Sequence, residues 1–167
     1  MTTFYDTYPG WLVALTISEI IAALALSVMI IAPFGWWAVG GYGALGLATL
    51  ASSLAFGCTR CHYYGRLCGT GLGRVAALIF GKREEEEFGN SPSQMLAWTL
   101  VGITLLIPLA GGLAALSGRS SILGLMALAT YVGLLIVISV THSRLVCYRC
   151  HEARHKRCTL GRLGKSL

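Results

Sequence analysis

The chain alternates long apolar runs with short polar segments. Four windows of about 20 residues, the length that crosses a bilayer, carry almost no charge: 11–31, 36–56, 95–116 and 122–140. Because a lone strand in lipid leaves its backbone groups without hydrogen bonds, each window should form a helix. The composition agrees, with 55% hydrophobic and only 12% charged residues. The pattern therefore predicts a membrane protein with four transmembrane helices.

Short turns group these helices into pairs. Residues 33–35 separate the first two runs and residues 118–121 separate the last two. Connections this short join antiparallel neighbours, so each pair should form a hairpin that returns to the side it left. The chain then divides into a first hairpin (1–57), a Cys-rich segment with an interfacial loop (58–93), a second hairpin (94–141) and a Cys-rich C-terminal segment (142–167).

The distribution of charge predicts the orientation. All Lys and Arg residues except Arg119 lie in segments 58–93 and 142–167. By the positive-inside rule, both segments and both termini face the cytoplasm, in the cytoplasmic (inner) membrane. The net charge of +6 then suits anionic lipid. Nucleic acid is not expected as a partner, because the basic residues adjoin span ends and form no recognisable binding module.

The two halves resemble each other, which predicts an internal repeat. Each half has two spans, a CxxCH motif, a third Cys and a glycine-containing basic stretch, GTGLGR after Cys68 and TLGRLG after Cys158. Both halves run in the same direction, so the repeat should be parallel, with its axis along the membrane normal. The predicted fold is all-α, two transmembrane hairpins in a parallel repeat, with a Cys-rich metal-binding cap on one side.

The spacing of the cysteines favours metal binding. Two CxxC turns each offer a pair of thiolates suited to a tetrahedral ion, and each is followed by a third Cys. The candidate ligands are Cys58, Cys61, His62, Cys68, Cys147, Cys150, His151, His155 and Cys158. They could hold zinc or an iron–sulfur cluster.

The two copies differ in how complete their ligand sets are. The second contains C-x2-C-x4-H-x2-C, ending at His155 and Cys158, which supplies three thiolates and one imidazole. In the first copy Arg66 stands in the place of His155. A fourth ligand there would have to come from His62, from the other half or from an exogenous group. Three arrangements remain open: one closed and one open site, one four-thiolate site made from both CxxC pairs, or an iron–sulfur cluster held by cysteines from both halves.

Two other interpretations of the cysteines also remain open. CxxCH is the spacing that attaches haem c, and His142, His155 or a Met could supply distal ligands. Covalent haem attachment ordinarily takes place outside the bacterial cytoplasm, however, and haem gives no role to Cys68 or Cys158. Basic neighbours would also favour thiolates for redox exchange.

One carboxyl group lies within the predicted spans. Glu19 is about two turns into the first helix, where a charge is costly and normally faces the bundle interior or a watery cavity. No second ionisable residue of the spans is expected to pair with it, so the sequence does not predict a proton pathway.

The predicted function is that of a metalloprotein subunit. It would serve electron transfer or the assembly of a larger membrane complex, with other membrane subunits or as a homo-oligomer. No catalytic acid–base constellation is recognisable, so an enzymatic activity is not assigned. A membrane dihaem cytochrome and a soft-metal transporter or sensor are the alternatives.

Overall fold

The computed structural model describes residues 4–84, 88, 91–118 and 122–151. Four helices dominate it: α1 (Gly10–Ile31), α2 (Trp36–Ser52), α4 (Pro92–Gly118) and α5 (Ile122–Thr141). All four belong to segments that are long and apolar enough to cross a membrane, and the described residues contain no strand. The predicted all-helical class is therefore confirmed for the described residues, with four helices long and apolar enough to span a membrane.

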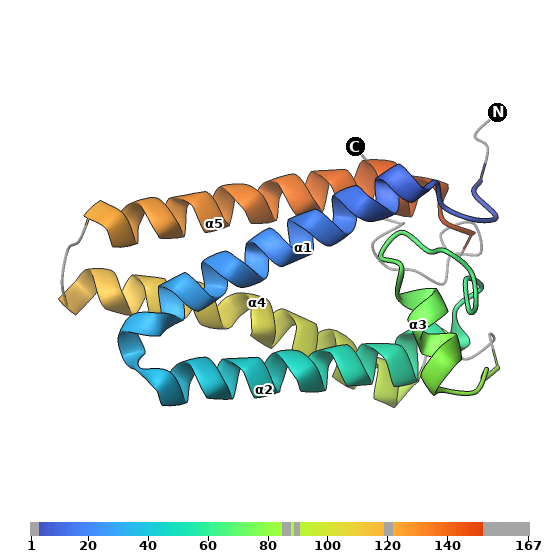
Figure 1. Ribbon diagram of the computed structural model, residues 1–167, viewed down its shortest axis with the longest axis horizontal. Helices are drawn as coiled ribbons and strands as arrows, with labels where there is room; N and C mark the ends of the chain where they lie inside the picture. Colours follow the sequence, from blue (N-terminus) through green and yellow to red (C-terminus); the bar gives the residue numbers. More distant parts are fainter. Residues whose placement is uncertain (1–3, 85–87, 89–90, 119–121, 152–167) are drawn as a thin grey trace.

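The helices form two hairpins. The turn between α1 and α2 lies at the same end of the molecule as the end of α4 and the start of α5 (Figure 1). In the first hairpin, the 3₁₀ turn η1 (Ala32–Phe34) leads into Gly35, which has φ +96°. This backbone conformation strongly favours glycine. The two CxxC motifs and the short helix α3 (Leu72–Ile79) lie at the opposite end, which we call the cap end.

The helices pair mainly between hairpins rather than within them. Helix α1 packs along α5 and α2 packs along α4, as Figure 1 shows, while α4 also contacts α1 and α5. Tyr42 on α2 and Tyr131 on α5 donate hydrogen bonds to the carbonyls of Thr104 (3.3 Å) and Leu105 (3.2 Å) on α4. The two hairpins therefore form one interlocked bundle.

The outer faces of the helices are apolar and exposed. On α1, Ile21 and Met29 face outward, and Trp36 and Trp37 lie almost fully exposed at the start of α2. The buried face of α1 follows helical spacing and consists of Leu12, Val13, Thr16, Glu19, Ala23, Ser27, Ile30 and Ile31. Apolar surface of this extent suits contact with lipid, and interfacial Trp residues are typical of membrane helices.

Helices α2 and α5 end in the same unusual way. Helix α2 continues into a π-helical turn, η2 (Ser53–Gly57), and then a 3₁₀ turn, η3 (Cys58–Arg60). Helix α5 continues into the π-helical turn η5 (His142–Val146) and the 3₁₀ turn η6 (Cys147–Arg149). Both paths then become extended, at Cys61 (φ −83°, ψ 146°) and at Cys150 (φ −79°, ψ 136°). Each CxxC motif thus begins on a tight turn at a helix end.

Candidate functional site

The two CxxC turns have matching backbone hydrogen bonds. The amide of Cys61 donates to the carbonyl of Cys58 at 3.4 Å, and that of Cys150 to the carbonyl of Cys147 at 3.2 Å. In a 3₁₀ turn, side chains three residues apart lie on the same side. This arrangement suits two thiolates that bind one ion.

The structure brings the two CxxCH motifs into contact. The imidazole rings of His62 and His151 stack with centroids 3.8 Å apart and planes 10° from parallel. Cys61 and Cys150 pack, together with Cys68, against one buried cluster at the cap end, formed by Tyr8, Leu12, Val13, Tyr63 and Val146. Side chains from both halves of the chain therefore share one small volume.

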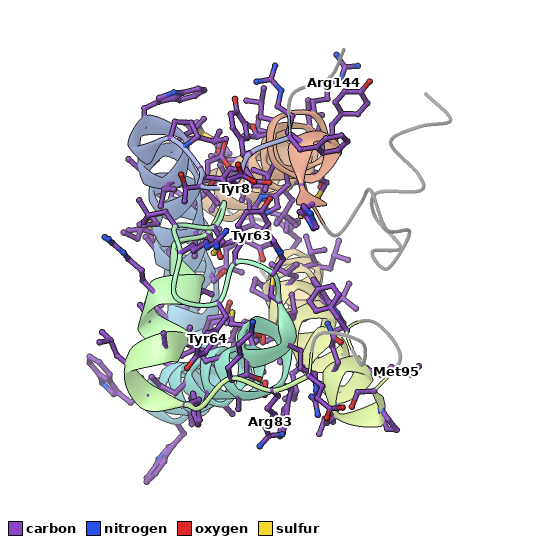
Figure 2. The ribbon with its side chains drawn as sticks, turned by 90° about the vertical axis from the view of Figure 1, so that its right-hand side faces the viewer. Tyr8, Tyr63, Tyr64, Arg83, Met95 and Arg144 are labelled. Atoms are coloured by element: carbon purple, nitrogen blue, oxygen red, sulfur yellow. The ribbon has the colours of Figure 1, made fainter. Side chains whose placement is uncertain are left out.

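Three tyrosines, Tyr5, Tyr8 and Tyr63, join the N-terminal segment to both motifs. Successive rings lie 5.2 Å apart, and Figure 2, which faces the cap end, shows Tyr8 close to Tyr63. The hydroxyl of Tyr8 donates to the carbonyl of Val146 at 2.8 Å, and its amide donates to the carbonyl of Leu67 at 3.0 Å. Tyr8 thus connects the loop of the first motif to the helix end of the second.

Tyr63 makes a second connection between the halves. Its hydroxyl donates to the carbonyl of Tyr5 at 2.8 Å and accepts from the amide of His151 at 3.0 Å. Burial raises the pKa of Tyr63 to about 12, and negative charge on Cys150 and Cys61 acts in the same direction. Burial, followed by Cys150, also raises the pKa of Tyr8. Both phenols are therefore neutral near pH 7.

Cys68 lies in a glycine-rich loop that adjoins the first turn. Its Sγ accepts a hydrogen bond from the amide of Gly73 at 3.3 Å. Hydrogen bonds to a ligand sulfur of this kind orient it and support a bound metal.

Glycines allow the close approaches in this loop. A Cβ at Gly73 would collide with the carbonyl oxygens of Tyr63 and Arg66, and one at Gly69 would collide with Val146. Gly71 has φ +74°. The GTGLGR glycines therefore form tight turns beside the Cys residues and a contact with the second half.

The described residues do not by themselves assemble a metal site. Within residues 4–84, 88, 91–118 and 122–151, no three His, Cys, Asp or Glu side chains converge closely enough to hold an ion. His155 and Cys158, which would complete the second copy, lie outside the described residues. The described Cys and His residues are of types that bind metals and the cysteines are partly buried, but they do not converge on one ion.

Comparison with known proteins adds no assignment to this geometry. The chain matches no protein-family model, no curated protein and no solved structure. A functional proposal must therefore rest on the side chains themselves.

That no second ionisable residue of the spans pairs with Glu19 stays a prediction. His142, the first residue of η5, lies on the continuation of α5, the helix along which α1 packs. Because the apolar run ends at 140, the sequence pattern assigned His142 to the polar segment. In the structure the helical path continues through His142. The tyrosines of the cap end were also missed. Their concentration before the first span, FYDTY, is the signal that could have indicated them.

Proposed function

We propose that this chain is an integral membrane metalloprotein subunit whose two Cys segments jointly hold one metal centre, either zinc or iron–sulfur. The observation that carries the proposal is the stacked contact of His62 with His151. It joins CxxCH motifs from the two halves at one end of the bundle. A shared centre is therefore favoured over two separate ones.

The helix ends support the predicted parallel repeat. The two CxxC motifs follow equivalent paths through a π-helical turn, a 3₁₀ turn and an extended residue. A buried tyrosine precedes each π-helical turn by the same interval (42 to 53 and 131 to 142). In a parallel repeat, α1 would correspond to α4 and α2 to α5. Exchanging the two halves would then turn the α1–α5 pair into the α4–α2 pair, and both pairs are present. We infer a two-fold pseudo-axis that passes between the stacked imidazoles.

The ligands would come from both segments. The first offers Cys58, Cys61 and Cys68, and the second offers Cys147 and Cys150, with His62 and His151 between them. Because the described side chains do not converge, binding requires a ligand from 152–167, such as His155 or Cys158, or a rearrangement of side chains. Iron would supply one-electron transfer, whereas zinc would fix the cap end as a structural unit.

Orientation and partners follow from charge and surface. The concentration of Lys and Arg at the cap end supports a cytoplasmic location for both Cys segments and both termini, in the inner membrane. Apolar helix faces contact the bilayer and could also bind other membrane subunits or a second copy of this chain. A role in electron transfer or in assembly is favoured over catalysis.

The test is an absorption spectrum and metal quantification of the full chain purified from membranes without oxygen. Broad sulfur-to-iron absorption supports a cluster, and a colourless protein with stoichiometric zinc supports a structural centre. A sharp Soret band would establish the dihaem alternative and overturn the cytoplasmic orientation. Protein that carries no metal and takes none up from added zinc or iron would contradict the proposal.

A further inference from the structure

The short helix α3 has the opposite pattern from a surface helix of a water-soluble protein. Its inward face consists of small residues, since Gly73 and Ala76 are buried. Its large apolar side chains point outward: Leu78 is 87% exposed, Ile79 62% and Val75 40%. With eight residues, α3 is too short to cross a bilayer. Among the described residues, no other part of the chain covers this outer face.

The elements against which α3 packs indicate what covers it. Its start adjoins α1, where a Cβ at Gly71 would lie 3.2 Å from Cγ1 of Val13 and 3.6 Å from Cδ1 of Ile17. The helix also packs on η2 and η3, which continue α2. Val13 and Ile17 belong to the candidate span Gly10–Phe34, and η2 and η3 belong to the candidate span Trp36–Arg60. Helix α3 therefore lies beside parts of the chain that are themselves apolar enough to lie in the membrane.

Both views of the molecule agree on the orientation of α3. It runs across the direction of the four long helices (Figures 1 and 2). Figure 2, which faces the cap end, shows α3 in green at the margin of the bundle, on the side of α1 and α2. A short helix at the end of the spans, across their direction and with its apolar face turned away from the bundle, has the geometry of an interfacial helix.

The charges around α3 fit a boundary between lipid and water. Arg74 is exposed and lies one turn before Leu78 on the same face, so its guanidinium can reach headgroup phosphates while its aliphatic part stays beside the apolar side chains. Residues 82–87 are all charged, with two basic and four acidic side chains. Such a run stays in water, because charge is costly in hydrocarbon. The chain thus changes from apolar to fully charged within a few residues, as at the edge of a bilayer.

The inner contacts of α3 connect its outer face to the first Cys segment. The amide of Gly73 donates to Sγ of Cys68 at 3.3 Å, and the carbonyl of Gly73 accepts from the amide of Gly65 at 3.0 Å. Beyond the end of α3, the hydroxyl of Tyr64 donates to the carbonyl of Phe80 at 2.7 Å. Helix α3 is thus fastened at both ends to the loop that carries Cys68.

We propose that α3 is an interfacial anchor that binds the phospholipid bilayer at the cap end. Val75, Leu78 and Ile79 enter the boundary of the acyl chains, and Arg74 contacts headgroup phosphates. The occupant of this face is lipid rather than protein, because α3 packs beside candidate spans whose own outer faces are apolar and exposed. The bilayer then fixes the depth of the loop that carries Cys68. This inference rests on insertion of the four long helices in a membrane and is independent of the proposed metal centre.

The test locates the side chain of Leu78 in the full chain, in phosphatidylcholine nanodiscs. Leucine methyl groups are isotope-labelled, and the NMR signal of Leu78 is identified by its loss in Leu78→Met. Two paramagnetic probes are compared, a lipid with a nitroxide on its acyl chain and a water-soluble gadolinium chelate. We expect the lipid probe to broaden the Leu78 signal several-fold more than the chelate does. Leu47, which is 70% exposed on α2, and Leu12, which is 1% exposed, are the references for full lipid contact and for burial.

Two outcomes of this measurement would overturn the proposal. Stronger broadening by the chelate would place Leu78 in water. Shielding from both probes, as for Leu12, would mean that a protein surface, such as a second copy of this chain, covers α3.

A second measurement follows hydrogen exchange of the amides of residues 69–80. Leu78→Ser removes the outward contact without disturbing the inner packing, so exchange should become several-fold faster. Gly81→Ser is the matched control, since nothing lies within 4 Å of a Cβ there, and should leave exchange unchanged. Arg74→Gln should also speed exchange, whereas Arg144→Gln, which removes another exposed cation, should not. Exchange that is unchanged in Leu78→Ser contradicts the anchor, and equal effects of the two Arg variants contradict the headgroup contact.

Discussion

The two Cys turns follow the same backbone path but are anchored by different parts of the chain. In the first, Thr59 and Arg60 are buried, whereas in the second the corresponding Tyr148 is 47% exposed and Arg149 is exposed. The local path is therefore a property of the helix end and its CxxC motif. Burial depends on which segment covers each turn.

The end of α2, the residues after α3 and the start of α4 cover the first turn. Arg60 donates to the hydroxyl of Ser93 and to the carbonyl of Phe56, both at 3.3 Å, and the amide of Arg83 donates to the carbonyl of Thr59 at 2.9 Å. The second turn is instead contacted by the N-terminal segment, where the amide of Tyr5 donates to the carbonyl of Arg149 at 3.3 Å. A substitution in a segment that contacts one turn should therefore affect that turn more than the other.

The largest effect is expected from Gly73→Ala, which affects the first turn. Its Cβ would collide with backbone oxygens that have no room to move, so we expect the free energy of unfolding to fall by about 1–3 kcal/mol. Gly133→Ala on α5 is the control, since nothing lies within 4 Å of a Cβ there. Denaturant unfolding in detergent, followed by circular dichroism, measures both. Equal stability of the two variants would show that the glycine loop is not packed as described.

A smaller effect is expected from Tyr8→Phe, which affects the connection to the second turn. Loss of the hydrogen bond to Val146 should cost about 1 kcal/mol. Tyr148→Phe removes the hydroxyl of a half-exposed ring and should change stability little. The same unfolding measurement compares the two. A Tyr148→Phe loss as large as that of Tyr8→Phe would contradict the anchoring role of the N-terminal segment.

The last effect appears only under alkaline conditions and concerns the pH dependence of stability that Tyr63 contributes. Its pKa rises from 10.0 to about 12 in the folded protein, because burial disfavours the phenolate. Between these values the unfolded chain loses a proton that the folded chain keeps, so stability is intact below pH 10 and falls as the pH rises toward 12. Tyr63→Phe should weaken this alkaline decline, which stability measured against pH would reveal. An unchanged decline would assign it to other groups.

The sequence predicted the helices closely, because apolar runs of membrane-spanning length have few alternative structures. Predicted windows 11–31 and 122–140 correspond to α1 (Gly10–Ile31) and α5 (Ile122–Thr141). The π-helical turns were not predicted, since nothing in the hydrophobic pattern distinguishes them from the end of a helix. They carry the helical path beyond the apolar run and include His142, which the hydrophobic pattern assigned to the polar segment.

The candidate site was predictable only as a set of residue types. CxxCH spacing indicated that the cysteines act together, but it could not show that His62 stacks on His151. That contact depends on how two hairpins pack, and on tyrosines that carry no motif of their own. The identity of any metal depends on which side-chain atoms coordinate it together, and the spacing of the Cys residues does not specify that set.

The most direct test of a shared centre is the metal content per chain of Cys61→Ser and Cys150→Ser, each compared with wild type and with Ser143→Ala. If both segments hold one centre, either Cys variant should lose nearly all of the metal, while Ser143→Ala keeps the wild-type amount. If each variant instead retains half of the wild-type metal, the two Cys segments bind separately, and the account of one joint centre is wrong.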